Sequence, residues 1–411
     1  MSYTVQTTEL LNPDEALEIV LSSVPAMGVE RVALRECLGR ILAEDARADE
    51  DLPPFDNSAM DGYAVIAADT AGAQKDSPRR LRVIGEQPAG RAAAPPVAPG
   101  TAVRIMTGAP IPEGADAVVM VEDTVSGDDE VTVYREVPVG ANIRRAGEDV
   151  NRGDIVVGEG ARIGPAQMGM LASVGMARPP VYRKPRVAIV TTGDELVGAE
   201  AKPGPGQIRN GNQYSLLGQA LNAGAEVPML QRTGDLKEEI ERALRRAAEV
   251  CDVVIVCGGV SVGDYDFVKD VLEQLGEMRF WRVAIKPGRP VVFGHIGGKP
   301  VFGLPGNPVS CMVTFDLFVR PVLLRMTDIA DVAPRVVTGT LTGDLRHKPG
   351  LREYVRAVTT YADGGYLARP IPKHGSGMLS SMVAANSYVV LREDRGDARS
   401  GEAVEVMVFP L

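Results

Sequence analysis

The stretch GGVSVGDYD (258–266) combines residue types that suit a phosphate bound beside a metal ion. Gly258 and Gly259 let backbone N–H groups approach an anion closely, and Ser261 adds a hydroxyl. Asp264 and a second aspartate follow near the start of a predicted helix, where they could hold Mg²⁺ next to a pyrophosphate. Helix capping would explain one of these acids. The whole set therefore favours a phosphate and Mg²⁺ site.

Two other loops carry related residues. TTGDEL (191–196) contains Glu195, although adjacent acids after a buried strand are common and can simply cap the next segment. LPGNP (304–308) places Pro308 at the first position of a predicted helix, which is an ordinary helix start. Gly306 lies just before that start and would expose N–H groups toward an anion at the positive end of the helix.

Lys286 and Arg289 flank a Pro-Gly turn between the second and third of these loops. A solvated basic turn is the alternative, but in a chain with net charge −10 two such cations favour anion binding. No GxGxxG opens a helix, no GxxxxGK[ST] occurs, and no His or Cys is placed as an activated nucleophile. Carboxylates, cations and amides suit metal-assisted chemistry at a phosphoanhydride.

The composition excludes several other classes of protein. A net charge of −10 argues against nucleic-acid binding, which depends on Lys and Arg. Four cysteines without a CxxC pair and only three histidines make a zinc site improbable. The N-terminus has no signal-peptide pattern and no apolar run could span a bilayer, so we expect a cytoplasmic protein.

The three loops that carry these glycines and acids need strands to position them. Short apolar runs such as RVAIV (186–190), DVVIVC (252–257) and VFGL (301–304) alternate with helical patterns, which predicts a doubly wound α/β domain over 181–328. Ligands of such domains bind outside the carboxyl ends of the strands. Within this domain we expect Asn212 to cap one helix, and Asp235 with a glutamate three residues later to form the capping box of the next.

A length of 411 residues predicts several domains. Helices that begin after Asn12 and Gly164 would belong to a first domain, over 1–50 and 141–180. Short alternating runs rich in Gly, Pro and Val predict an inserted β domain over 51–140. Similar runs over 329–411 predict a C-terminal β-barrel or sandwich.

The residues resemble the MoeA-type molybdopterin molybdenumtransferases, whose eukaryotic counterpart is the E domain of gephyrin. The resemblance covers nearly the whole chain, and its longest block is PPFDNSAMDGYAV (53–65). Further blocks follow in the family order: RIMTGAPIPEGADAVVMVED (104–123), RRAGEDV (144–150), TTGDEL (191–196), GGVSVGDYD (258–266), KPGRPVVFG (286–294), GLPGNPVS (303–310) and GSGMLSS (375–381).

This resemblance implies an elongated homodimer of several subdomains that inserts molybdate into adenylylated molybdopterin and releases AMP, assisted by Mg²⁺. It also implies a cleft shared between the α/β domain of one subunit and the inserted β domain of the other. Molybdopterin adenylyltransferase and recipient molybdoenzymes are the expected partners. Neither nucleic acid nor membrane is expected as a partner.

The resemblance also suggests residue roles. Asp61, Thr107, Arg144 and Asp149 match residues that line the molybdate side of the family's cleft. Glu195, Asp235 and Asp264 are the candidate Mg²⁺ ligands, and Asp61, Thr107, Glu195 and Asp264 the candidate catalytic residues. Phosphate or oxyanion contacts are expected from Gly258, Gly259, Ser261, Lys286, Arg289, Pro305, Gly306, Pro308 and Ser376. Arg289 stands where many relatives have lysine, and Ser380 and Ser381 are alternatives to Ser376.

Two other functions fit parts of the sequence. The α/β domain alone resembles the related molybdopterin adenylyltransferase, although the N-terminal and C-terminal blocks argue for the molybdenumtransferase. A non-enzymatic scaffold dimer is the second alternative, since gephyrin also serves as a scaffold. The intact acidic loops argue against it.

Overall fold

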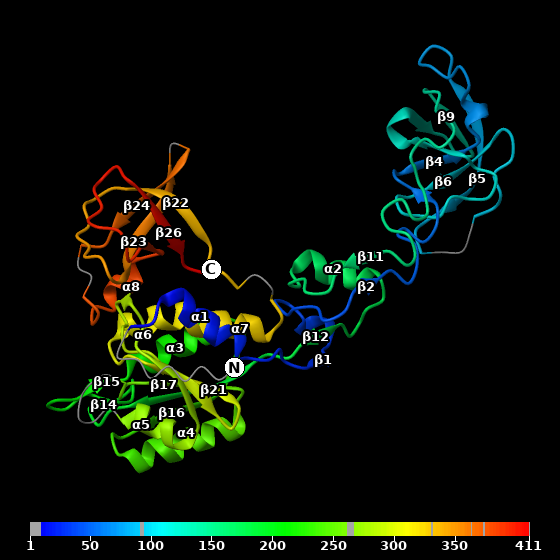
Figure 1. The fold of residues 1–411 in the computed structure, drawn as a ribbon. Helices are drawn as coiled ribbons and strands as arrows, with labels where there is room; N and C mark the ends of the chain where they lie inside the picture. The colour runs from blue at the N-terminus through cyan, green and yellow to red at the C-terminus, as the bar shows by residue number, and fades with distance from the viewer. Residues whose placement is uncertain are drawn as a thin grey trace. The chain divides into compact units, whose positions relative to one another are not determined.

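The computed structural model describes residues 10–90, 94–260, 267–329, 332–362, 364–372 and 375–410 (Figure 1). Ser261 and Asp264, the predicted phosphate and Mg²⁺ ligands, lie outside these residues. Contacts divide the chain into two compact units. The larger comprises Met1–Glu30, Gly39–Ile41 and Val181–Leu411, and the smaller comprises Arg31–Leu38 and Leu42–Pro180.

The centre of the larger unit is a six-stranded sheet. Its strands are β13 (Arg186–Thr192), β16 (Glu226–Thr233), β17 (Val253–Cys257), β18 (Glu277–Trp281), β20 (Val292–Ile296) and β21 (Lys299–Leu304). They lie in the order β16-β13-β17-β21-β20-β18, and the four strands from β16 to β21 are parallel.

Helices cover both faces of this sheet. They are α1 (Pro13–Ser22), α3 (Gly211–Asn222), α4 (Lys237–Val250), α5 (Phe267–Leu275), α6 (Pro308–Thr314) and α7 (Arg320–Met326), with a π-helical turn at Phe315–Val319. Successive residues of a strand point to opposite faces. Ile189 accordingly packs with residues of α3 and α6, whereas Val190 packs with residues of α4 and α5. The predicted doubly wound α/β domain is confirmed.

The sheet differs from the prediction at one edge, because β18 and β20 run antiparallel to their neighbours. Gly297 and Gly298, both with positive φ, join β20 to β21. Two such residues form the tight turn of an antiparallel hairpin. A parallel connection would need a crossover of a dozen or more residues, for which there is no chain here.

Two predicted helix starts are wrong. The side chain of Asn210, and not that of Asn212, caps α3 by accepting a hydrogen bond from the backbone N of Gln213. No capping box precedes α4, whose N-cap is Leu236. Asp235 instead accepts a hydrogen bond from the backbone N of Asp194, on a neighbouring loop. The carboxylate of Asp235 is therefore oriented by that loop and not by its own helix.

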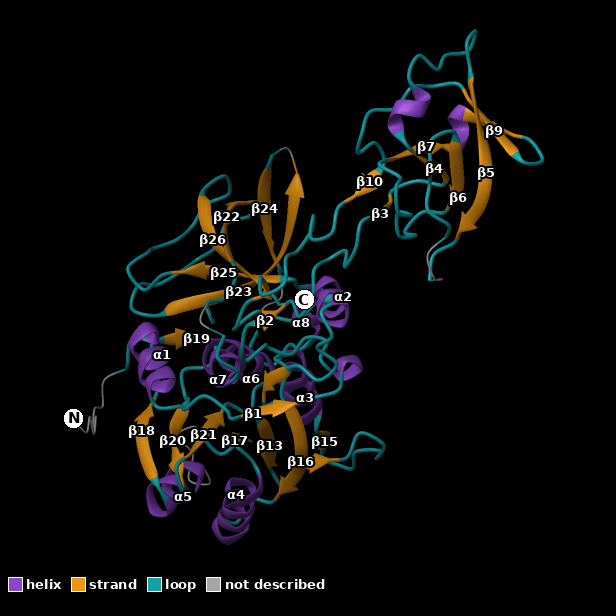
Figure 2. Ribbon diagram, turned by 90° about the vertical axis from the view of Figure 1, so that its right-hand side faces the viewer, coloured by secondary structure: helices purple, strands orange, loops and turns teal. Residues whose placement is uncertain are grey.

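The C-terminal part of the larger unit is a closed barrel (Figure 2). Its strands are β22 (Val336–Leu341), β23 (Arg352–Ala362), β24 (Gly365–Pro370), β25 (Ser387–Leu391) and β26 (Ala403–Val408). Each pairs with two others, and the β23–β25 ladder completes the ring. The short β19 (Ile285–Lys286) extends β23 on one side, and α8 (Ser380–Ala384) precedes β25. The barrel confirms the predicted C-terminal β domain.

The smaller unit contains a second six-stranded sheet. Its strands are β4 (Gly62–Val65), β5 (Arg79–Gln87), β6 (Thr101–Ile105), β7 (Ala117–Met120), β8 (Thr124–Ser126) and β9 (Glu130–Val133). The remaining elements of this unit include the ladders β2 (Ala46–Arg47) with β11 (Ile155–Val157) and β3 (Asn57–Ser58) with β10 (Ile143–Arg144), and α2 (Pro165–Ser173).

A β sheet within 51–140 agrees with the inserted β domain that the sequence predicts, while the exact domain boundaries stay a prediction. Gly62 has a steric reason to be glycine, because a Cβ at this position would overlap the carbonyl of Val119 on the paired strand β7. Across the described ranges, no helix has the length and apolar character that a membrane crossing requires.

Candidate functional site

The parallel strands bring four loops to one edge of the sheet. Thr192 is paired with Thr233, and Thr191 with Cys257. Cys257 is also paired with Leu304. All four strands therefore end at the same level, and the loops that follow them meet outside their carboxyl ends, where α/β sheets bind ligands.

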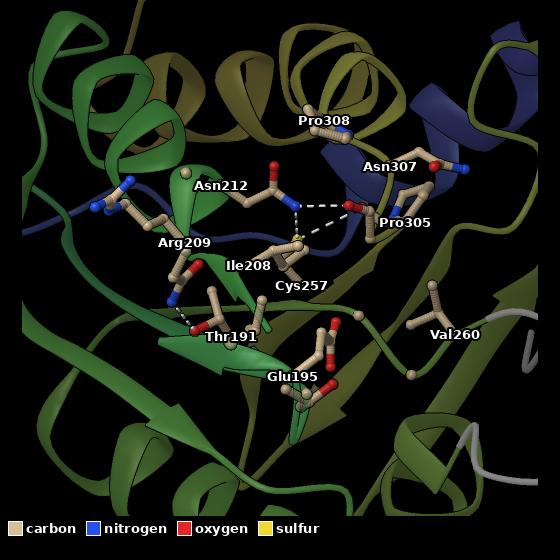
Figure 3. Close-up of a pocket in the computed structure, with 18 of the residues that line it drawn as sticks. Thr191, Glu195, Ile208, Arg209, Asn212, Cys257, Val260, Pro305, Asn307 and Pro308 are labelled. Carbon is tan, nitrogen blue, oxygen red and sulfur yellow. Dashed lines mark hydrogen bonds between the residues drawn. The ribbon is translucent and has the colours of Figure 1, made fainter. Parts of the chain in front are cut away.

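A cleft of about 640 Å³ lies among these loops (Figure 3). Thr191, Thr192, Asn212 and Cys257 also line it. The structure thus brings together residues from four separate stretches of the sequence. The predicted residues in its lining are Glu195, Asp235, Gly258, Gly259, Pro305, Gly306 and Pro308.

Two carboxylates belong to the lining of this cleft. The backbone N of Asp194 donates to Asp235, and the backbone N of Asp235 donates to Asp194, each over 3.3 Å. These reciprocal bonds tie together the loops that follow β13 and β16. The carboxylate of Glu195 folds back over Gly193, occupying the space that a Cβ of residue 193 would need. The positive φ of Gly193, 149°, is the stronger reason for glycine here, because the flexible side chain of Glu195 could move aside.

The donor set fits the Mg²⁺ that the resemblance in the sequence implies. Magnesium is usually held by one or two carboxylates together with substrate phosphates, and not by an all-protein cage. Glu195 and Asp235 offer two carboxylates in one cleft, next to a glycine turn. In the part of the chain that is described, no cluster of three or more His, Cys, Asp or Glu side chains is arranged to hold a metal by itself.

The turn after β17 is built from two glycines with positive φ, Gly258 at 102° and Gly259 at 64°. A Cβ on Gly258 would lie 2.7 Å from Oγ1 of Thr192 and 2.8 Å from its carbonyl oxygen. Such a contact is too short for a real side chain, so both the conformation and the packing demand glycine. The amide of Gly258 donates to the carbonyl of Leu304 at 3.0 Å, which leaves the amide of Gly259 as the one that suits an anion.

Two asparagine side chains of the cleft were not predicted from the sequence to belong to a ligand site. Asn212 donates from Nδ2 to the carbonyl of Gly306 at 2.7 Å, which ties α3 to the loop after β21 (Figure 3). The same Nδ2 lies 3.3 Å from Sγ of Cys257. Asn210 donates to the hydroxyl of Thr191 at 2.7 Å. In the sequence, these asparagines precede a helix and look like ordinary helix caps. Nothing in that pattern indicates that they face a ligand site.

A second pocket of about 720 Å³ adjoins the first and shares Pro290 and Asn307 with it. It is lined by Lys286 and Arg289, as the sequence predicts for an anion site, and by Ser376. The carbonyl of Ser376 accepts the backbone N of Val309 at the start of α6. Of the three candidate serines, only Ser376 is in the lining described for this pocket.

Arg356 is a cation of this pocket that the sequence analysis missed. It lies on β23, is almost completely buried, and donates to the hydroxyl of Ser381 and the carbonyl of Gly375. Burial lowers the pKa of its guanidinium, which nevertheless stays charged because the reference pKa is so high. An arginine in an otherwise buried strand could have been noticed, since such a residue needs a partner or a ligand.

Lys286 is held in place by a buried acid. Its Nζ lies 2.9 Å from Oε1 of Glu353, whose other oxygen is 3.1 Å from Nδ1 of His347. Glu353 therefore offsets part of the positive charge of the pocket. Arg289 has no carboxylate within ion-pair distance among the described residues.

The other predicted site residues belong to the smaller unit. Oδ1 of Asp61 accepts two hydrogen bonds from Thr107, and both residues are exposed. Arg144 lies on β10, opposite Asn57 of β3, and Asp149 donates its backbone N to the carbonyl of Leu52. Both side chains are exposed. Their roles toward molybdate stay predictions.

Family comparisons cover almost all of the chain. Residues 11–175 match the MoeA N-terminal region (domain I and II), and residues 188–325 match a probable molybdopterin binding domain. Residues 338–409 match the MoeA C-terminal region (domain IV). The two flanking matches do not favour an adenylyltransferase consisting of the α/β domain alone.

Similar proteins match this chain over nearly their whole length. The molybdopterin molybdenumtransferase of Bacillus subtilis is 38% identical over 403 residues, covering 96% of this chain and 93% of that protein. Molybdopterin molybdenumtransferase 2 of Mycobacterium tuberculosis is 38% identical over 381 residues, covering 91% and 94%. The crystal structure of a MoeA protein from Pyrococcus horikoshii OT3 matches with a TM-score of 0.82 and 35% identity, covering 98% and 100%.

An α/β domain with a cleft of amides and carboxylates, joined to a barrel that adds a cationic pocket, defines a multidomain enzyme built to bind anions. The chain belongs to the molybdopterin molybdenumtransferase family.

Proposed function

We propose that this chain inserts molybdenum from molybdate into adenylylated molybdopterin and releases AMP. One observation carries the proposal: a cleft of glycine amides and carboxylates adjoins a cationic pocket, and the two share Pro290 and Asn307. The first suits a nucleotide-linked phosphate, and the second suits an oxyanion. Their contact would place a phosphoanhydride next to the incoming molybdate.

In the first cleft, the amide of Gly259 would bind a phosphate oxygen, while the amide of Gly258 holds the turn to β21 by donating to the carbonyl of Leu304 at 3.0 Å. Asn212 would hold the loop around Gly306 in position, because it bonds to that carbonyl. Glu195 and Asp235 would hold Mg²⁺. Mg²⁺ would neutralise charge that develops on the phosphoanhydride oxygens as AMP leaves.

In the second pocket, Arg289 and Arg356 would bind molybdate, since arginine donates several hydrogen bonds to an oxyanion. Ser376 adds a hydroxyl to the same pocket. The paired Lys286 would contribute less charge than Arg289, because Glu353 already neutralises it. The difference between Lys286 and Arg289 therefore comes from the ion pair with Glu353, and not from the difference between lysine and arginine.

The quaternary structure and the partners also belong to the proposal. We expect a homodimer that receives adenylylated molybdopterin from an adenylyltransferase and passes its product to molybdoenzymes. In that dimer, Asp61, Thr107, Arg144 and Asp149 of one subunit would complete the molybdate side of the other subunit's site. A cytoplasmic location remains a prediction of the sequence. Sedimentation of the purified chain in dilute solution would measure the dimer directly.

The test of the function is an assay with adenylylated molybdopterin, molybdate and Mg²⁺, in which AMP release and molybdenum insertion are both measured. The unaltered chain should perform both. Glu195→Ala and Asp61→Ala should each lower both rates by at least about tenfold, the size expected for losing one charged contact. If the unaltered chain releases no AMP, the proposed function is wrong.

Glu200→Gln is the matched control for Glu195. Glu200 folds back over Gly198 as Glu195 does over Gly193, but it is not among the residues that line the cleft. This variant should keep the rates of the unaltered chain. Full activity in both alanine variants would remove the site assignment while leaving the family membership intact.

A further inference from the structure

Two adjacent threonines at the end of β13 differ in how their hydroxyls are used. Thr191 accepts a hydrogen bond from Asn210 at 2.7 Å and lies 3.5 Å from the carbonyl of Gln231, to which it can donate. The hydroxyl of Thr192 is enclosed and has no hydrogen-bond partner among the described residues. Thr192 is only 6% exposed, yet it belongs to the lining of the cleft.

The unpartnered hydroxyl of Thr192 faces the glycine turn. A Cβ built on Gly258 would lie 2.7 Å from Oγ1 of Thr192, and one on Gly259 would lie 3.3 Å from it. Only backbone therefore covers this oxygen on the side of the turn. No side chain of residues 258 and 259 therefore separates the hydroxyl from a ligand bound at the turn.

An enclosed hydroxyl without a partner costs free energy, and valine would fill nearly the same volume without that cost. A hydroxyl in this position is explained if a ligand supplies the missing partner. The neighbouring amide of Gly259 suits a phosphate, whereas the amide of Gly258 already donates to the carbonyl of Leu304. A phosphate oxygen bound there would come close to Thr192 and could accept its proton.

We propose that Thr192 is a further substrate-binding residue, whose hydroxyl donates a hydrogen bond to the phosphate that docks on the Gly258–Gly259 turn. The inference rests on the proposed function, because it takes the nucleotide phosphate as the ligand of that turn. The two threonines then have different roles. Thr191 connects β13 to α3 and β16 by hydrogen bonds, and Thr192 binds the ligand.

The test compares Thr192→Val, Thr192→Ser and Thr191→Val. AMP binding is measured by calorimetry in the presence of Mg²⁺, and the thermal unfolding midpoint Tm is measured without AMP. Thr192→Val should bind AMP about tenfold more weakly, equivalent to about 1.4 kcal/mol, while its Tm stays level or rises. Thr192→Ser should restore the affinity. Thr191→Val should lower Tm, because it removes hydrogen bonds that are already made.

Binding of AMP by the unaltered chain separates this inference from the proposed function, since its absence would count against the function itself. Given that binding, a Thr192→Val protein within about threefold of the unaltered affinity would overturn the inference. A weaker affinity that Thr192→Ser shares would overturn it as well. If Thr192→Val does not fold, the AMP affinity of Thr192→Ala is compared with that of Thr192→Ser instead, with the same expected results.

Discussion

A single carboxylate oxygen of Asp61 accepts both the backbone N–H and the hydroxyl of Thr107, each over 2.7 Å. The two residues are 46 positions apart, and the bonds join the turn before β4 to the loop after β6. The backbone N–H, followed by the hydroxyl, lowers the pKa of Asp61 below its usual value. Asp61 is therefore kept ionised in more acidic solution than an ordinary aspartate.

The first prediction concerns this pair. If ionised Asp61 is required, the molybdenum insertion rate falls as the pH drops through the pKa of Asp61. Thr107→Val removes one of the two donors and so raises that pKa, which should move the acid limb of the pH profile to higher pH. Thr107→Ser keeps the donor and should keep the profile. Identical acid limbs in Thr107→Val and the unaltered chain would show that the hydroxyl does not tune Asp61.

The second prediction concerns Arg289 in the cationic pocket. Arg289→Ala removes a cation that has no carboxylate within ion-pair distance among the described residues, so the molybdate concentration for half-maximal rate should rise. The loss of a charge-assisted contact corresponds to about a tenfold to hundredfold rise. Arg289→Lys keeps the positive charge and should lose much less.

Lys299→Ala is the control for Arg289. Lys299 pairs with Asp252 at 3.6 Å and is not part of either pocket, although its removal changes the net charge by the same amount. Its molybdate dependence should equal that of the unaltered chain. An equal rise in Lys299→Ala and Arg289→Ala would mean that the overall charge, and not the pocket, attracts molybdate.

The cleft could be anticipated because its strands are buried runs. VVIVC (253–257) and the residues around Ile189 can only be central strands, and parallel strands end at one edge. The acids and glycines that follow such runs must then meet. The cationic pocket was anticipated only in part. Lys286 and Arg289 share a turn, whereas Arg356 comes from a distant barrel strand, and its place in a buried strand does not show which pocket it enters.

One prediction from the sequence was wrong because a hydrogen bond to a distant loop takes the place of the expected local helix cap. Asp235 matches a capping pattern, yet its carboxylate accepts the amide of Asp194 from a loop 41 residues away. The antiparallel edge of the sheet was missed as well, although Gly297 and Gly298 are a recognisable hairpin turn. Short edge strands with mixed polarity, such as Glu277–Trp281, lack the apolar run that marks the central ones.

The third prediction compares two glycines of the cleft. Gly258→Ala would place a Cβ 2.7 Å from Thr192 at a positive φ, which costs about 1–3 kcal/mol in strain alone. This variant should lose AMP affinity and have a lower Tm. Gly211→Ala adds a methyl where no atom lies within 4 Å and should change neither quantity. Calorimetry and thermal unfolding of both proteins give the comparison, and equal AMP affinities would contradict an anion site at this turn.

The last prediction concerns a buried acid between the α/β domain and the barrel. Asp316 lies in the π-helical turn after α6, where it accepts hydrogen bonds from Gln219 on α3 at 2.8 Å and from Tyr388 on β25 at 3.0 Å. Burial raises the pKa of Asp316 to about 6. The folded chain therefore binds more protons than the unfolded chain between about pH 4 and pH 6, and stability falls as the pH rises through that window.

Asp316→Asn removes this titration while keeping a polar side chain of the same size. It should raise Tm at pH 8 by a few degrees relative to the unaltered chain, corresponding to roughly 2–3 kcal/mol, and the advantage should vanish near pH 4. Tyr388→Phe removes a donor that lowers the pKa of Asp316. In this variant the pH range over which stability falls should therefore extend to higher pH. A Tm difference between Asp316→Asn and the unaltered chain that is the same at pH 4 and pH 8 would show that Asp316 is ionised throughout. In that case the hydrogen bonds from Gln219 and Tyr388 would outweigh the cost of burying its charge.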